Sequence, residues 1–241
     1  MFEEISFHET KLGELVLRRR TEPRLNDVLV YEVKLGDEFL MSSLFTVGER
    51  ALATLALARR EAMQNLNVVV GGLGLGYTAA EALKDDRVQS LIVIEALGPV
   101  IEWHRSGLVP LGNALAGDKR CRLINGDFFA LSQNRERGFD HDAPGRAFDA
   151  ILLDIDHSTK HWLAPGYQSF YAPSGMTTLA EHLVPGGVFA MWSDDGPDAD
   201  FVRTLESTFV DVSAEVVEFY NPDLDDTASC TIYLAQKRSE K

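Results

Sequence analysis

A short run of valines leads directly into a turn made largely of glycine. Residues 68–70 are valines that predict a buried strand, and Gly72, Gly74 and Gly76 then alternate with leucines. Glycine permits tight turns and a close approach of the backbone to a ligand. A strand, a glycine turn and a helix in this order favour a nucleotide-binding α/β fold, with a purely structural turn as the alternative. The spacing differs from the G-x-G-x-x-G pattern of dinucleotide-binding proteins, so a nicotinamide cofactor is less favoured.

Apolar segments alternate with helical segments along most of the chain. Continuous apolar strands separated by helices indicate a mostly parallel sheet that is covered on both faces. The last strand follows a hairpin-like segment, which predicts that it runs in the reverse direction. The predicted strands are 68–70, 91–94, 121–124, 150–153, 188–192 and 231–234, and the predicted helices are 48–64, 77–83, 100–104, 175–183 and 198–208.

The first part of the chain has a different character. Residues 1–47 predict short strands joined by turns, and we expect them to form a small β-hairpin region. Residues 48–241 then form the nucleotide-binding α/β domain. Residues 132–146 are polar and contain glycine and proline, so they predict a long exposed loop.

Acidic side chains follow the predicted strands of the second part. Glu95 ends the second strand, where a carboxylate accepts hydrogen bonds from ribose hydroxyls in nucleotide-binding α/β folds. Asp127 follows the third strand and can hold an adenine amino group, while Phe128 can pack on the ring. A solvated strand end for Glu95 and a helix N-cap for Asp127 are the structural alternatives. Open α/β sheets bind ligands at this edge, so we expect these residues to share one site.

The fourth strand is followed by a second acidic group. Asp154 can accept a proton from an attacking amine, and Asp156 can bind a cationic substrate. The two side chains face the same side if the strand continues that far. His157 can also contact the substrate, and a role as general base is the weaker alternative. A metal site needs more ligands than we can place, so no metal is expected.

The net charge of the chain is strongly negative. It carries 37 acidic and 23 basic side chains, for a formal net charge of -14. Such a surface repels nucleic acid and anionic membranes and attracts a small cationic acceptor such as a polyamine, although acidity alone specifies no partner. Two cysteines are too few for a disulfide framework. No signal peptide precedes the fold, so we expect a cytoplasmic protein.

From Val68 to Trp192 the chain resembles the spermidine synthase family, a branch of the class I methyltransferase fold. The resemblance implies a Rossmann-like sheet, S-adenosylmethionine or decarboxylated S-adenosylmethionine as co-substrate, and a homodimer or larger oligomer. It implies loop contacts to the sulfonium ligand from Gly72 and Gly76, and we expect Gly74 to belong to the same cofactor-binding turn. The other residues that it matches are Glu95 for ribose, Asp127 for adenine, Asp154 for amine deprotonation, Glu49 for a polyamine-binding segment and Tyr171 for the end of a Phe-Tyr segment near the substrate.

Three departures from the family pattern leave the reaction open. Gly74 stands where the family has an aspartate that pairs with the ammonium of decarboxylated S-adenosylmethionine. His157 stands at the second acidic position after the fourth strand, and the N-terminal family signature is not visible. Our first hypothesis is aminopropyl transfer to a di- or polyamine. Gly74 favours the alternative, methyl transfer from intact S-adenosylmethionine to a small molecule. The third hypothesis is a non-catalytic member that keeps the nucleotide pocket, or only the fold, for binding or assembly.

Overall fold

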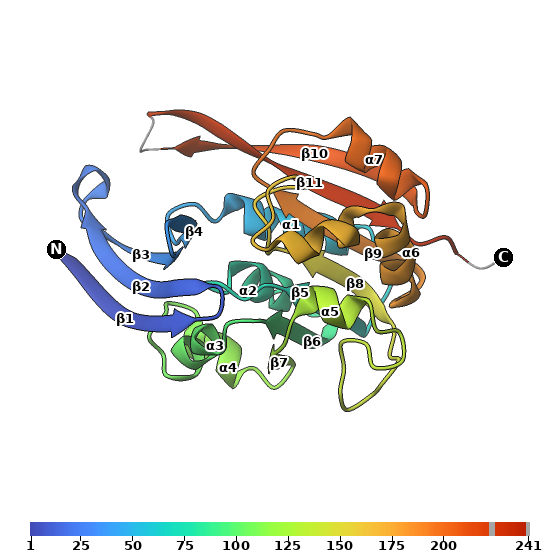
Figure 1. The fold of residues 1–241 in the computed structure, drawn as a ribbon, viewed down its shortest axis with the longest axis horizontal. Coiled ribbons are helices and arrows are strands. Elements are labelled where there is room, and N and C mark those ends of the chain that lie inside the picture. The colour runs from blue at the N-terminus through green and yellow to red at the C-terminus, as the bar shows by residue number, and fades with distance from the viewer. Residues whose placement is uncertain (222–224, 240–241) are drawn as a thin grey trace.

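The computed structural model describes residues 1–221 and 225–239, which form two β-sheets and the helices around them (Figure 1). The small sheet is antiparallel with the order β1-β2-β3-β4. The large sheet has the order β10-β11-β9-β8-β5-β6-β7. Their bounds are β1 Phe2–Thr10, β2 Gly13–Glu22, β3 Val28–Leu35 and β4 Glu38–Ser42, then β5 Leu66–Gly71, β6 Val88–Glu95, β7 Cys121–Asn125, β8 Phe148–Leu153, β9 Leu183–Ser193, β10 Val210–Asn221 and β11 Asp226–Gln236.

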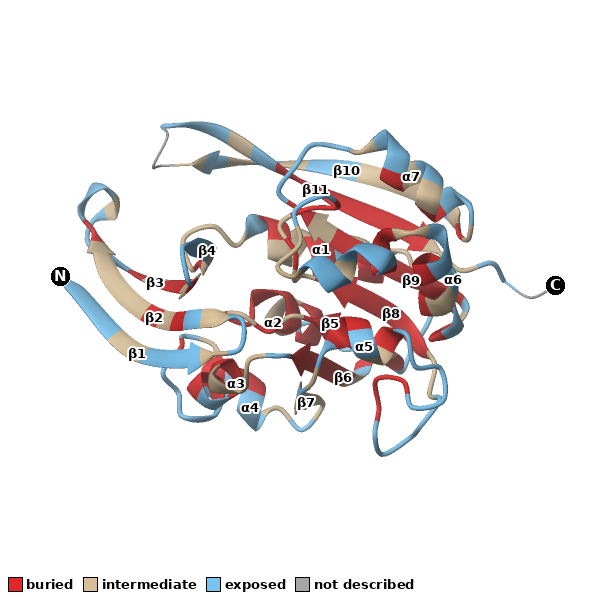
Figure 2. Ribbon diagram, viewed as in Figure 1, coloured by how far each residue is buried: buried red, intermediate tan, exposed pale blue. Residues whose placement is uncertain are grey.

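The large sheet is parallel from β9 through β8, β5 and β6 to β7, whereas β11 runs antiparallel to both β9 and β10. This confirms the predicted Rossmann-like α/β sheet with a reversed last strand. All six residues of β8 are buried, including Asp149, and the apolar run 150–153 is typical of a strand covered on both faces (Figure 2). Val68 and Val70 of β5 join one buried cluster and Val69 joins the other, which follows the two-residue period of a strand.

The helices cover the two faces of the large sheet. One buried cluster contains residues of α1 to α4 and of the small sheet, and the other contains residues of α5 to α7. No helix of the described ranges is long and apolar enough to span a membrane. The bounds are α1 Val47–Ala58, α2 Tyr77–Leu83, α3 Gly98–Arg105, α4 Gly112–Gly117, α5 Phe128–Ser132, α6 Pro173–Glu181 and α7 Ala199–Glu206, with short 3₁₀ helices at Pro23–Leu25 and Pro165–Tyr171.

The division predicted at residue 47 remains a prediction. The small sheet ends before α1 begins at Val47, yet its residues Leu15, Leu17 and Val33 share a buried cluster with α1. The first strand of the small sheet, β1, pairs only with β2 and is largely exposed.

Helix α1 ends earlier than the sequence predicted. Its last turn tightens, because the amides of Arg59 and Arg60 donate to the carbonyls of Ala56 and Leu57, three residues back. The Arg60 guanidinium then turns under the large sheet, where it lies 2.8 Å from Asp149 Oδ1. This buried ion pair draws the chain away from the helix axis, so residues 59–64 are not helical.

Strand β10 was not predicted, because it carries no apolar run. It lies at the edge of the large sheet and pairs only with β11. None of its side chains is fully buried. An edge strand of this kind lacks the continuous apolar pattern that revealed β5, β6 and β8.

The loop 132–146 is exposed over 133–137 and 141–145, as predicted, but it is anchored by buried residues in its middle (Figure 2). Phe139 is fully buried and stacks on Phe128 with ring centroids 5.0 Å apart. Asp140 is also buried and accepts hydrogen bonds from Arg122 and Arg146. Because the segment is mostly polar, its composition did not predict that Phe139 and Asp140 are buried.

We expect Phe139→Ala to lower the free energy of unfolding by about 3–5 kcal/mol, because it leaves a cavity among packed aromatic rings. The matched control is Arg137→Ala in the same loop, whose side chain is exposed. It should change the free energy by no more than about 0.5 kcal/mol. Urea unfolding measures both, and equal effects of the two substitutions would show that the loop is not anchored through Phe139.

Candidate functional site

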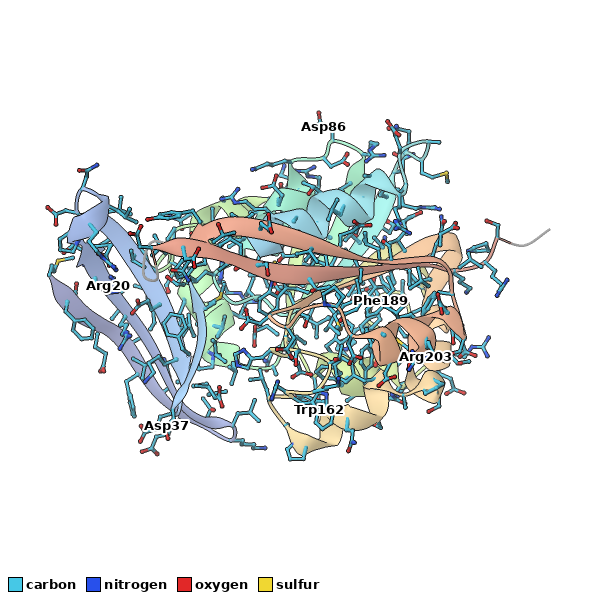
Figure 3. The ribbon with its side chains drawn as sticks, turned by 90° about the horizontal axis from the view of Figure 1, so that it is seen from above. Arg20, Asp37, Asp86, Trp162, Phe189 and Arg203 are labelled. Carbon is cyan, nitrogen blue, oxygen red and sulfur yellow. The ribbon has the colours of Figure 1, made fainter. Side chains whose placement is uncertain are left out.

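A cavity of about 330 Å³ lies at the carboxyl ends of the parallel strands. The small sheet closes one side of it and the β10–β11 hairpin, which reaches from the large sheet toward the small one in Figure 3, closes another. A volume in this range suits a small molecule or a nucleotide cofactor. Its position at the carboxyl ends of the parallel strands is where open α/β sheets bind their ligands.

The three alternating glycines form the turn at one wall of this cavity. Gly72, Gly74 and Gly76 have φ angles of 93°, 46° and 91°, in the left-handed region that favours glycine. A Cβ at Gly72 would collide with the carbonyl oxygen of Asp154. Glycine is thus needed here both for the backbone conformation and for the contact between the turn and the end of β8.

Met41 of β4 fills the space beside Gly74. A Cβ at Gly74 would collide with the Met41 sulfur, and the amide of Leu75 donates to that sulfur over 2.8 Å. The resemblance to the spermidine synthase family places an aspartate at position 74. In this chain a thioether from the small sheet occupies the volume into which such a side chain would project.

Glu95 ties the glycine turn to the end of β6. Its side chain is 9% exposed and lines the cavity. One carboxylate oxygen accepts from the Leu73 amide over 3.0 Å and the other from the Leu97 amide over 2.8 Å. Burial raises the pKa of Glu95, and these backbone amides act against that shift. A carboxylate held in this way keeps further lone pairs for a ligand hydroxyl.

Asp127 and Phe128 lie at the start of α5 beside the same cavity. Asp127 caps the helix through Oδ1, which accepts from the amides of Phe129 and Ala130 over 2.9 and 3.2 Å. Its exposed side chain also lines the cavity, so the cap and a ligand contact are compatible. Phe128 is buried against Gly71 and contributes part of its surface to the cavity. Tyr167 also lines the cavity and stacks on Phe129, with ring centroids 3.9 Å apart.

Asp154 lies at the floor of the cavity and is accompanied by Glu49 from the first turn of α1. Asp154 Oδ2 accepts from the Thr78 hydroxyl over 2.6 Å. Burial raises the pKa of Asp154 to about 6, and the Thr78 bond opposes that shift. Burial and the charge of Asp154 together raise the pKa of Glu49 to about 8. Near neutral pH the two carboxyl groups therefore hold about one proton between them.

Asp156 and Tyr171 are brought together, but outside the cavity. Strand β8 ends at Leu153, so Asp156 does not share the orientation of Asp154. Asp156 is 3% exposed and accepts from the Tyr171 hydroxyl over 2.6 Å and the Leu163 amide over 2.8 Å. Neither Asp156 nor Tyr171 lines the cavity, whereas His157 does, with Nε2 3.4 Å from Glu38 Oε2.

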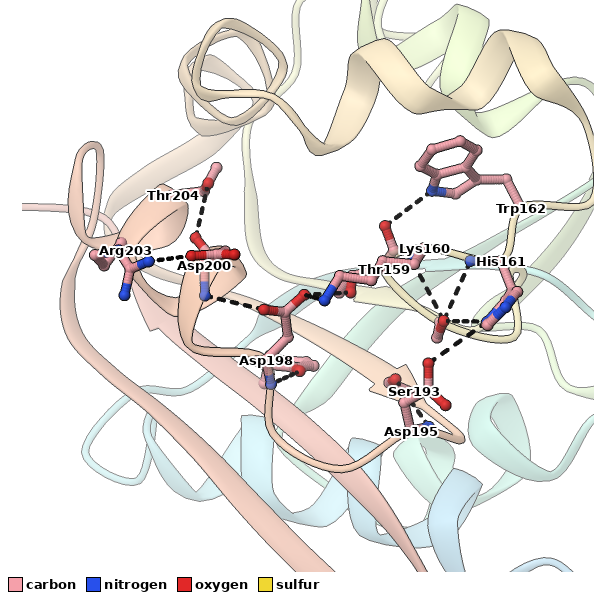
Figure 4. A network of polar contacts seen from close by, with 12 residues as sticks. Thr159, Lys160, His161, Trp162, Ser193, Asp195, Asp198, Asp200, Arg203 and Thr204 are labelled. Carbon is pink, nitrogen blue, oxygen red and sulfur yellow. Dashed lines mark hydrogen bonds and ion pairs between the residues drawn. The ribbon is translucent and has the colours of Figure 1, made fainter.

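A polar network holds the segment after β8 against the segment after β9 (Figure 4). Asp198 lies 3.1 Å from the Thr159 hydroxyl and 2.9 Å from Lys160 Nζ. Ser158 and Asp195 both approach Nδ1 of His161, at 3.1 and 3.6 Å. A Ser-His-Asp triad uses the two ring nitrogens for different partners, so this group is not such a triad. Within residues 1–221 and 225–239, no group of three or more candidate metal ligands is found.

Sequence reasoning missed the part of the lining that comes from the segment between β4 and α1, from β9 and from the β10–β11 hairpin. Phe45, Phe219 and Cys230 all line the cavity, as does Trp192 at the end of β9. Phe45 and Phe219 face each other with ring centroids 6.2 Å apart. No local pattern marks these residues, because they come from four separate segments that meet only in the fold.

Comparison with known proteins agrees with this architecture. No family model matches the chain. The spermidine synthase of Thermotoga maritima is similar in structure, with a TM-score of 0.69 and 18% identity, and the match covers 98% of this chain and 73% of that one. A spermidine synthase in complex with the transition state analogue AdoDATO has a TM-score of 0.71 and 17% identity, over 98% and 74% of the two chains. The chain has the spermidine synthase fold.

Within this spermidine synthase fold, the raised pKa of Glu49 makes stability depend on pH. The folded protein keeps a proton on Glu49 that the unfolded chain releases above its ordinary pKa of 4.5. Stability should therefore fall as pH rises from about 4.5 to about 8, because ionisation of Glu49 increasingly favours the unfolded chain while the folded protein still holds the proton. Glu49→Gln removes this penalty and should be stabilising by on the order of 1–2 kcal/mol more at pH 8 than at pH 5.

Thermal or urea unfolding at several pH values measures this effect. Glu215→Gln on the exposed surface of β10 is the matched control, and its effect should be small at every pH. A Glu49→Gln curve that stays parallel to the parent curve would contradict the burial of this carboxyl group.

Proposed function

We propose that this protein transfers an aminopropyl group from decarboxylated S-adenosylmethionine to a small amine acceptor. The charge of the cavity carries this proposal. Its described lining contains five acidic side chains, two of which share a proton, and neither lysine nor arginine; the five are Glu49, Glu95, Asp127, Asp154 and Asp194. Decarboxylated S-adenosylmethionine carries a sulfonium and an ammonium but no carboxylate, so an anionic cavity with low-dielectric walls attracts it.

Intact S-adenosylmethionine fits this lining less well. Its α-carboxylate would meet the Glu49–Asp154 pair, which keeps a negative charge although it shares a proton, without a cationic side chain in the described lining to balance the repulsion. Gly74, which lacks the family's aspartate, supports methyl transfer as the second candidate. Against it, Met41 fills the volume beside Gly74, and acidic charge is supplied instead from α1 and from the end of β8.

The residues around the cavity support the transfer as follows. The nucleotide would lie along the glycine turn, with its ribose at Glu95 and its adenine near Asp127 and Phe128. The acceptor nitrogen attacks the propyl carbon next to the sulfonium, the carbon–sulfur bond breaks, and neutral 5′-methylthioadenosine leaves. Asp154, with Glu49 beside it, assists removal of the amine proton. Most of the acceleration comes from holding the two reactants in line.

The comparisons support this proposal at the level of the fold. One similar structure is a spermidine synthase bound to a transition state analogue, at 17% identity. We further propose that the protein acts in the cytoplasm, as a homodimer or larger oligomer, on small molecules. The formal net charge of -14 supports the absence of nucleic acid and anionic membranes among its partners.

The identity of the nucleoside product tests the reaction. We expect incubation with decarboxylated S-adenosylmethionine and a mixture of amines to release 5′-methylthioadenosine, detected by chromatography. Asp154→Asn should lower kcat by about 10²–10⁴-fold while leaving binding of the donor largely intact. Asp195→Asn is the control, because Asp195 follows the same sheet edge but does not line the cavity.

Other outcomes would contradict the proposal. Release of S-adenosylhomocysteine from intact S-adenosylmethionine would establish methyl transfer. Tight binding of either donor without turnover, unchanged in Asp154→Asn, would establish a non-catalytic member of the fold.

A further inference from the structure

The acceptor end of the cavity has an apolar wall directly beside the acid pair. We call Phe45, Trp192 and Phe219 the aromatic wall. Trp192 and Cys230 pack onto the start of α1, since a Cβ at Gly48 would lie 2.5 Å from the indole nitrogen and 2.9 Å from the thiol sulfur. Gly48 immediately precedes Glu49, so Trp192 and Cys230 lie next to the residue that pairs with Asp154.

Cys230 adds apolar surface to this wall. Burial raises the pKa of its thiol to about 11, and the charges of Glu49, Asp194 and Asp154 add to the shift. The thiol is therefore protonated and unreactive at neutral pH, and it packs as a small apolar group. Cys230 lines the cavity and lies against Gly48, the residue before Glu49.

The second ammonium group of a diamine acceptor would find few charged partners along the aromatic wall. Asp156, which the sequence suggested for that task, is buried against Tyr171 outside the cavity. Asn221 and Ser229 line the hairpin side but carry no charge. Asp194 is exposed at the rim, where an ion pair contributes little because water screens it. An ammonium group against the aromatic wall would lose hydration and gain only cation–π attraction from the rings. In the described lining, no buried carboxylate lies beside it beyond the Glu49–Asp154 pair, which holds the first amino group.

We propose that the acceptor is a primary monoamine with an apolar aryl or alkyl body. This inference rests on the aminopropyl transfer proposed above. The amino group lies at Glu49 and Asp154, and the body packs against the aromatic wall. A carbon–nitrogen bond forms to the propyl group, the carbon–sulfur bond breaks, and the amine proton passes to the acid pair. The products are an N-substituted 1,3-diaminopropane and 5′-methylthioadenosine.

A matched pair of acceptors tests the proposal. n-Butylamine and 1,4-diaminobutane have the same chain and differ in a terminal methyl or ammonium group, and 2-phenylethylamine adds an aromatic body. We expect kcat/KM, measured by release of 5′-methylthioadenosine, to be about tenfold or more higher for the two monoamines than for the diamine. A higher value for 1,4-diaminobutane would overturn the proposal.

A substitution in the wall provides the second measurement. Phe219→Asp places a carboxylate beside Phe45 and should shift the kcat/KM ratio toward 1,4-diaminobutane by about tenfold or more. Val216→Asp, exposed on the same strand, is the control and should leave the ratio unchanged. An unchanged ratio in Phe219→Asp would place the acceptor elsewhere.

The two proposals fail in different ways. If no amine releases 5′-methylthioadenosine although the donor binds, aminopropyl transfer itself is wrong. If product forms and the diamine is preferred, the reaction stands and only the assignment of the acceptor is wrong.

Discussion

The contact between Gly72 and the carbonyl group of Asp154 holds the site together. Strands β5 and β8 run parallel and adjacent, and Gly71 pairs with Leu153 at their ends. Beyond that pair the Asp154 amide donates to the Gly71 carbonyl over 2.8 Å, and any side chain at position 72 would collide with the Asp154 carbonyl oxygen. The glycine turn and Asp154 are thus fixed to one another by backbone alone. Preorganisation of this kind is what in-line group transfer requires of an enzyme.

Charge and burial then divide the cavity into two ends. At the end beside the glycine turn, Glu95 accepts hydrogen bonds from the backbone amides of Leu73 and Leu97, which keeps the turn in place. At the other end, Glu49 and Asp154 are held close enough that one carboxyl group raises the pKa of the other. Two carboxyl groups that share a proton can accept another one from a substrate without a large change in local charge. The aromatic rings around them exclude water, which strengthens every electrostatic interaction in the cavity.

The sequence predicted most of the large sheet, because buried parallel strands carry continuous apolar runs. The valines of β5 and the apolar stretch of β8 are clear examples. Motifs at strand ends predicted Glu95, Asp127 and Asp154 at one edge, and all three line the cavity. Strand β10 was not predicted, because a half-exposed edge strand has no continuous apolar run.

Long-range contacts could not be predicted from local patterns. Asp156 lies two residues from Asp154, yet the end of β8 at Leu153 sends the two side chains to different surroundings. Met41 and Phe219 approach the site from strands 33 residues before and 145 residues after Gly74, so neither spacing nor composition reveals them. The same limit applies to Phe139, whose polar neighbours gave no sign of its burial.

The central claim is that an anionic cavity in this fold selects a donor without a carboxylate. Calorimetric titration of the purified protein with decarboxylated and with intact S-adenosylmethionine, at the same salt concentration and pH, tests it most directly. We predict that the decarboxylated form binds with a Kd at least about tenfold lower, because only the intact form brings a carboxylate toward the negatively charged Glu49–Asp154 pair. Equal or tighter binding of intact S-adenosylmethionine would contradict the account.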